Sequence, residues 1–160
     1  MISNSKIHVG LKSLCDFDKC NKPDCHILIL DCDDISLNVV REFSKSLIAR
    51  FSLGNIHIIK TSKNSYHILS FVHRSFEEIL VMCKYAVYSG LVGELFMKFS
   101  EKKHYFVTRL DQKNGFSPIH IESYFDDRFS MNDNLECQDF YFKSSEMINS
   151  RYKVRQNINI

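Results

Sequence analysis

Three carboxylates stand within four residues, directly after a short apolar run, and they are the residues of this chain best suited to chemistry. Turn-forming residues on both sides of the run at 26–30 predict a buried strand. Asp31 and Asp33 follow at a spacing of two, so on an extended chain both carboxylates point to the same face. Such a pair is typical of a site for a hard divalent cation such as Mg²⁺ or Mn²⁺. The alternative is that Asp33 or Asp34 only caps the next helix, which explains one aspartate but not the pair.

A helix and a hairpin must hold this stretch in place. Ser36 can cap a helix, and apolar residues at spacings of three and four predict that helix over 37–51, closed at 54–55 by Gly and Asn. Strands are expected at 56–61 and 66–72. The polar loop between them is short, which predicts a hairpin.

The next stretch repeats this alternation of helix and hairpin. A capping box at 75–78 begins a second helix, which ends near Gly90. Apolar residues at 94–99 and 104–110 predict a second hairpin, and the alternating residues 118–124 predict a last strand.

Length and composition indicate one globular domain with a tail. Of the 160 residues, 44% are hydrophobic and 25% charged, and we expect a domain over 1–125 and a polar, partly flexible extension over 126–160. The net charge of +2 argues against a strongly polycationic protein, so any basic surface must be local. The sequence has no apolar stretch of the roughly 20 residues that span a bilayer and no apolar signal-peptide region at its start. We therefore expect a cytoplasmic protein, or a nuclear one in a eukaryote, without a membrane partner.

The cysteines do not follow a familiar zinc pattern. They are Cys15, Cys20, Cys25, Cys32, Cys83 and Cys137. The first three are five residues apart, which is wider than the Cys-x-x-Cys pair of most zinc sites. Without a secretion signal a disulfide framework is not expected either. The pattern favours cysteines that pack as small apolar side chains, with a structural zinc site as the weaker alternative.

The order strand, helix, strand, strand, helix, strand predicts an α+β fold of the ferredoxin-like or RNA-recognition-like type, with one extra hairpin. In that fold the first and third strands are antiparallel neighbours, and the fourth strand flanks the first on its other side. We therefore expect one end of the sheet to gather Asp31, Asp33, His67, Glu94, Arg109 and Asp111, with Lys60 and Lys63 at its rim. Acids of this kind hold metal ions, and basic groups neutralise triphosphate oxygens, so the set suits phosphoryl or nucleotidyl transfer.

These motifs resemble those of the archaeo-eukaryotic primase superfamily, whose catalytic subunits have an RNA-recognition-like core. The family's first motif, an apolar strand ending in acid-x-acid, matches residues 28–33. Its second motif, Ser-x-His at the start of a strand, matches residues 65–67. Its third motif, a carboxylate with a basic Arg-Leu segment after it, matches Glu94 with residues 109–110, or Asp111 in place of Glu94. The resemblance covers about residues 25–124.

The resemblance implies a DNA primase or primase-polymerase that makes or extends primers on single-stranded DNA during replication. Its substrates would be nucleoside triphosphates, and a helicase or other replication proteins would be its partners. The implied catalytic residues and ligands of Mg²⁺ or Mn²⁺ are Asp31, Asp33 and Glu94, with Asp111 as the alternative third carboxylate. The implied nucleotide-binding residues are Lys60, Lys63, Ser65, His67 and Arg109. The chain departs from the family in the loop at 62–65, which has no glycine.

Two other functions fit parts of the sequence. A non-catalytic nucleic-acid-binding module of replication would keep the fold without the chemistry. A phosphatase of the haloacid-dehalogenase kind would use Asp31 as nucleophile and Asp33 as acid and base, with the Thr/Ser strand at 58–62 and the acid pair at 126–127. The predicted hairpin after Ser62 stands against the phosphatase, because that fold needs a helix there.

Overall fold

The structure is a computed structural model that describes residues 9–15 and 24–157, and in these residues it is mixed α+β with two antiparallel sheets and four α-helices. The strands are β1 (Gly10–Lys12), β2 (His26–Cys32), β3 (Asn55–Ser62), β4 (Ser65–Arg74), β5 (Val107–Arg109) and β6 (Ile119–Phe125). The helices are α1 (Leu37–Phe51), α2 (Phe76–Tyr88), α3 (Glu94–Lys103) and α4 (Leu135–Asn157), and a 3₁₀ helix, η1 (Asp127–Asn132), precedes α4. The α+β class is the one that the sequence predicts.

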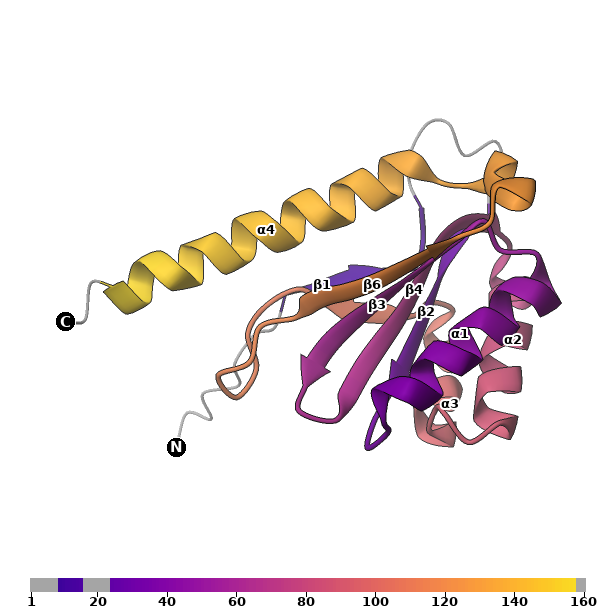
Figure 1. Cartoon of the computed structure of the whole chain (residues 1–160), viewed down its shortest axis with the longest axis horizontal. Coiled ribbons are helices and arrows are strands. Elements are labelled where there is room, and N and C mark those ends of the chain that lie inside the picture. The colour runs from indigo at the N-terminus through magenta and orange to yellow at the C-terminus, as the bar shows by residue number, and fades with distance from the viewer. Residues whose placement is uncertain (1–8, 16–23, 158–160) are drawn as a thin grey trace.

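A four-stranded sheet with the order β2-β4-β3-β6 is the centre of the molecule. Helices α1, α2 and α3 lie on one side of this sheet, and α4 runs along the other side (Figure 1). Side chains alternate between the faces of a strand, and Phe71 of β4 packs against Tyr141 of α4 with ring centroids 5.6 Å apart. His67 therefore belongs to the α4 face too, because it is four residues before Phe71 on the same strand.

Local signals set the starts of the first two long helices, as the sequence predicts. The Ser36 hydroxyl accepts the Val39 N–H at the start of α1. Ser75 and Glu78 form a complete capping box at the start of α2. A cap satisfies backbone N–H groups that have no partner within the helix, so it fixes where each helix begins.

Glycine at position 54 does not close α1, contrary to the sequence prediction. The C-cap is Ser52, which has a left-handed backbone with φ of 55°. Gly54 has a different role, because a Cβ atom there would lie 2.2 Å from Asp133 Oδ1 and 2.9 Å from the Phe129 carbonyl oxygen. The glycine lets the segment around η1 approach the start of β3.

The predicted strand at 94–99, and with it the second hairpin, is wrong, because these residues begin α3. Glu94 stands in the first turn of α3, and Lys102 and Lys103 stand in the last turn, which suits the helix dipole at both ends. An ion pair between Glu94 and Lys98 adds an i,i+4 contact. The chain leaves α3 through His104, whose left-handed backbone has φ of 64°.

The short strand β5 takes the place of the longer strand expected at 104–110. It pairs with β1, with Arg109 opposite Gly10 and Val107 opposite Lys12. The chain after β1 then continues along the start of β2, because the Ile27 N–H donates to the Ser13 carbonyl at 2.9 Å. Within the described residues, the edge of β2 therefore meets this short segment and not the long fourth strand that we expected.

The residues after β6 form part of the core. The Asn134 N–H donates to the carbonyl of Phe71 at 2.9 Å, which ties the start of α4 to β4. Cys137 and Tyr141 are buried against the sheet. In the described part of the chain, no helix has the length and apolar character that crossing a membrane requires.

Candidate functional site

The two residues at the centre of the predicted site lie directly opposite each other. Asp31 near the end of β2 pairs in register with His67 near the start of β4. His67 Nε2 lies 3.2 Å from Asp31 Oδ1. The imidazole is buried, whereas the carboxylate is about one-third exposed, at 31%. This is the neighbourhood that the predicted strand pairing requires, and it leaves the carboxylate open to a ligand.

Thr108 completes this contact from β5, although no motif in the sequence predicts it. Its hydroxyl lies 2.8 Å from His67 Nδ1, and it is fully buried. Asp31 therefore contacts one ring nitrogen of His67 and the Thr108 hydroxyl contacts the other. The two contacts fix the orientation of the ring. The only sequence signal for Thr108 is its place next to Arg109.

Arg109 reaches the same end of the sheet through β3. Its guanidinium Nη2 donates to the Thr61 carbonyl oxygen at 2.8 Å. Thr61 is the last residue but one of β3, directly before the turn that leads to His67. Asp111 follows β5 closely and is buried. The structure therefore places Arg109 near the turn between β3 and β4.

The turn after β2 touches the turn between β3 and β4. The Ile35 N–H donates to the Asn64 carbonyl at 3.0 Å. Asp33 and Lys63 belong to these two turns and are exposed, and Ser65 is half-buried. The two motifs of the sequence thus meet at their loops as well as at Asp31 and His67.

Lys60 does not share the face of His67. It pairs with Tyr66 on β4 and with Ile119 on β6. Its neighbour Ile59 is the residue opposite His67. Because side chains alternate along a strand, the Lys60 side chain lies on the face that α1 covers. Lys60 therefore lies at the same end of the sheet as His67 but on the opposite face, and its place at the rim stays a prediction.

Glu94 does not lie on the strand at 94–99 that was predicted to bring it beside Asp31. It is the first residue of α3, its side chain is 63% exposed, and it pairs with Lys98 at 3.0 Å. Among the residues that the structure describes, no three His, Cys, Asp or Glu side chains are arranged to hold a metal ion. Asp31 and Asp33 remain the two carboxylates that fit a divalent cation by their chemistry.

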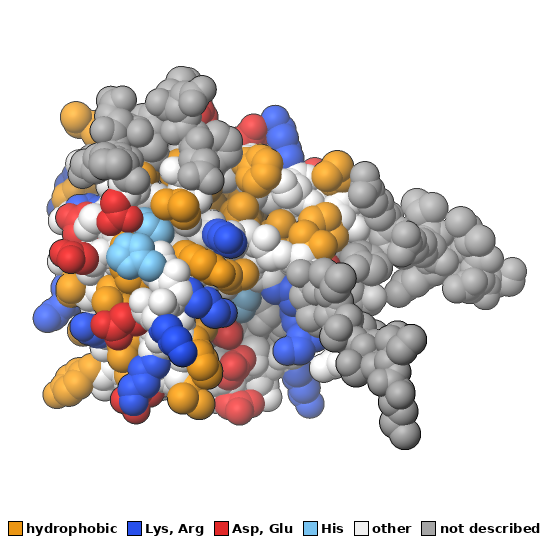
Figure 2. Space-filling view, turned by 180° about the vertical axis from the view of Figure 1, so that it is seen from behind, with side chains coloured by type: hydrophobic (Ala, Val, Ile, Leu, Met, Phe, Trp, Pro, Cys, Tyr) orange, Lys and Arg blue, Asp and Glu red, His pale blue; other side chains and the backbone are white. Residues whose placement is uncertain are grey.

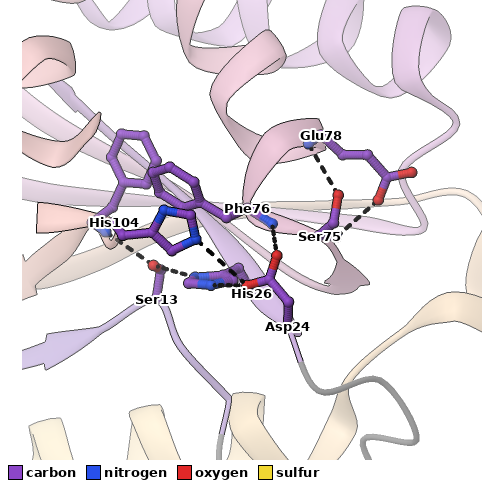
Figure 3. A network of polar contacts seen from close by, with 8 residues as sticks. Ser13, Asp24, His26, Ser75, Phe76, Glu78 and His104 are labelled. Atoms are coloured by element: carbon purple, nitrogen blue, oxygen red, sulfur yellow. Dashed lines mark hydrogen bonds and ion pairs between the residues drawn. The ribbon is translucent and has the colours of Figure 1, made fainter. Parts of the chain in front are cut away.

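A second polar network ties the start of β2 to two neighbouring elements (Figure 3). His26 Nδ1 lies 2.9 Å from the Ser13 hydroxyl, and His26 Nε2 lies 2.9 Å from Asp24 Oδ1. Burial lowers the pKa of His26, although the Asp24 carboxylate opposes this shift. The contacts run from Ser to His to Asp, as in a hydrolase triad. However, Ser13 is fully buried and its oxygen accepts the Phe106 N–H at 2.9 Å. Asp24 also accepts the Phe76 N–H at the start of α2, so the network is structural.

On the face of the molecule seen in Figure 2, charge is mixed rather than gathered in one field. Figure 2 shows Lys and Arg side chains interspersed with hydrophobic ones across the face seen from behind, with acidic side chains around them. This agrees with the net charge of +2. Binding of a nucleic acid would therefore need a local basic surface.

Comparison of the chain with models of known protein families, with curated proteins and with solved structures gave no match.

Proposed function

We propose that this chain is a primase-like nucleotidyltransferase, which makes or extends a primer on single-stranded DNA from nucleoside triphosphates. The observation that carries the proposal is the contact between Asp31 and His67. Each residue belongs to a different motif of the primase-like pattern, and the pairing of β2 with β4 puts them on one face of one sheet.

The carboxylates of Asp31 and Asp33 would hold Mg²⁺ or Mn²⁺, which neutralises phosphate charge and orients the attacking hydroxyl. Asp111 is the better candidate for a third carboxylate than Glu94, because it follows the strand that carries Thr108 and Arg109.

Basic side chains around these carboxylates would bind the triphosphate. His67 is held beside Asp31 by Thr108, and Arg109 is held beside the turn between β3 and β4. A guanidinium matches two phosphate oxygens at once, and Lys63 in that turn and Ser65 at the start of β4 would supply further donors. In this arrangement Thr108 is a positioning residue, since its hydroxyl acts through the imidazole of His67.

One observation favours a second candidate, a nucleic-acid-binding module of replication without catalysis. With Glu94 on α3, the described residues present no complete set of three carboxylates around the site. The phosphatase alternative loses support, because Ser62 leads directly through the turn into β4 and the sheet is antiparallel throughout.

The test is incubation of the chain with single-stranded DNA, labelled nucleoside triphosphates and Mg²⁺ or Mn²⁺. We expect labelled product from the unaltered chain and a loss of roughly 100-fold or more in the Asp31→Asn variant. Asp34→Asn is the matched control, because Asp34 is an exposed aspartate of the same turn, and it should keep the activity. Thr108→Val should lower the rate, since the His67 imidazole loses the hydroxyl that holds it in orientation.

Three results would contradict the proposal. Binding of DNA without any incorporation, unchanged in Asp31→Asn, would identify the non-catalytic module. Release of phosphate from a phosphomonoester, without incorporation of nucleotides, would favour the phosphatase function instead. Incorporation that survives in Asp31→Asn would place the active site elsewhere.

A further inference from the structure

Three cysteines and one histidine lie near one another beneath the start of α4, at the end of β2 opposite to Asp31. Cys15 lies opposite Cys25, because the Cys15 N–H donates to the Cys25 carbonyl at 2.8 Å and the next residues form an antiparallel bridge. Opposite residues of an antiparallel pair leave from the same face. Cys25 Sγ lies 3.3 Å from His73 Nδ1, which comes from the far end of β4.

Cys137 joins this group from the first turn of α4. Burial raises the pKa of the Cys137 thiol to about 12, and the nearby Cys15 and Cys25 add to this rise. Asn134 connects the same residues, since its side-chain amide donates to Cys15 Sγ at 3.0 Å and its side-chain oxygen accepts the Cys137 N–H at 3.1 Å. All three cysteines are buried.

We propose that Cys15, Cys25, His73 and Cys137 form a structural binding site for Zn²⁺. Three thiolates and one imidazole are a common ligand set of structural zinc, and soft sulfur ligands favour this ion over Mg²⁺. Binding releases the three thiol protons to solvent and forms three Zn–S bonds and one Zn–N bond. The site is separate from Asp31 and His67, so it stands or falls independently of the proposed nucleotidyl transfer.

The donors are gathered but are not yet arranged as a metal site within the described residues. A change between staggered χ1 rotamers moves a cysteine sulfur by roughly 3 Å, which is the scale of adjustment that four converging donors need. Asp133, next to this group, interacts electrostatically with His73 and would support it as a ligand. A bound ion would join the paired segments around Cys15 and Cys25 to β4 and α4.

The other buried thiols provide a matched control. Cys83 of α2 is also fully buried, and burial raises the pKa of its thiol to about 12. It interacts with Cys32, on the side of the sheet that faces α2. If burial alone made a cysteine bind metal, Cys83 would bind metal as well. The proposed site does not include Cys83, so its replacement should leave the metal in place.

The experiment is metal analysis of the full chain purified under reducing conditions, followed by replacement of zinc with Co²⁺. We expect about one zinc per chain and the absorption of tetrahedral, thiolate-bound cobalt. Cys25→Ala and Cys137→Ala should each lose the metal, and Cys83→Ala should keep it. Chelation should lower the melting temperature of the unaltered chain by roughly 5 °C or more, and that of folded Cys137→Ala much less.

Three results would overturn the site. The first is a chain that is isolated without zinc and takes up neither Zn²⁺ nor Co²⁺ under reducing conditions. The second is a disulfide between Cys15 and Cys25 in peptides from the native protein. The third is full metal content in both Cys25→Ala and Cys137→Ala, with circular dichroism showing that each variant is folded.

Discussion

His57 on β3 shows how burial sets the chemistry of a single residue. Its imidazole is almost fully buried among the rings of Phe71, Phe125 and Phe142, and its Nδ1 lies 2.7 Å from the Ser123 hydroxyl. Burial lowers the pKa of His57 to about 4, and the nearby imidazole of His120 adds to this shift. The ring is therefore neutral in the folded chain at neutral pH.

This lowered pKa predicts a loss of stability in acid. In the unfolded chain His57 titrates near 6.5, so between about 6.5 and 4 the unfolded state binds more protons than the folded state. The contribution is complete above pH 6.5 and falls as the pH drops to 4, by roughly 3 kcal/mol in total. Urea unfolding at a series of pH values should show this slope, and it should be smaller in His57→Gln.

Nuclear magnetic resonance gives a direct check on the same residue. The ring protons of His57 should titrate with a pKa of about 4. Titration near 6.5, or an equal slope of stability against pH in the variant, would show that burial does not control this imidazole.

Between elements, the connection of α1 to β3 depends on a close approach at Gly54. The backbone of η1 and the side chain of Asp133 occupy the space that a Cβ atom would need. Gly54 also accepts the Asp126 N–H at 3.0 Å, so it helps to fix the turn that follows β6. Gly54 therefore helps to dock the chain that follows the sheet.

Gly54→Ala should destabilise the fold by roughly 1–3 kcal/mol, because backbone and a short side chain cannot move aside cheaply. Gly93→Ala is the control, since no atom lies within 4 Å of its Cβ position, and its effect should stay below about 1 kcal/mol. Chemical denaturation measures both. Equal effects of the two substitutions would mean that η1 does not pack as described.

At the scale of the whole molecule, α4 decides whether residues 126–160 are an extension or part of the domain. Tyr141 is fully buried and packs against Phe71 and Phe142. Leu135, in the same helix, is 66% exposed. The early part of α4 thus supplies core, while the boundary at 125/126 remains a prediction.

Tyr141→Ala should destabilise the chain by about 3–5 kcal/mol, since it empties a large core position. Leu135→Ala should change the free energy of unfolding by less than about 0.5 kcal/mol. Tyr141→Phe keeps the ring and should be close to neutral, because the described residues offer its hydroxyl no hydrogen-bond partner. Small and equal effects of both alanine variants in denaturant titrations would make α4 an appendage.

Local patterns in the sequence determined the part of the fold from β2 to α2. The caps at Ser36 and Ser75 and the apolar spacing of α1 act over a few residues, so they can be read without tertiary structure. The pairing of Asp31 with His67 also followed, because a short hairpin and one crossover leave little choice of partner.

Tertiary structure alone decided the remaining features. Residues 94–99 are an apolar stretch too short to separate strand from helix by periodicity, and packing against α2 accompanies their helical form. Thr108 reaches His67, and Cys137 comes near Cys15 and Cys25, only through the return of the chain across the sheet. No spacing in the sequence encodes such a return, because it depends on which buried faces of distant elements fit together.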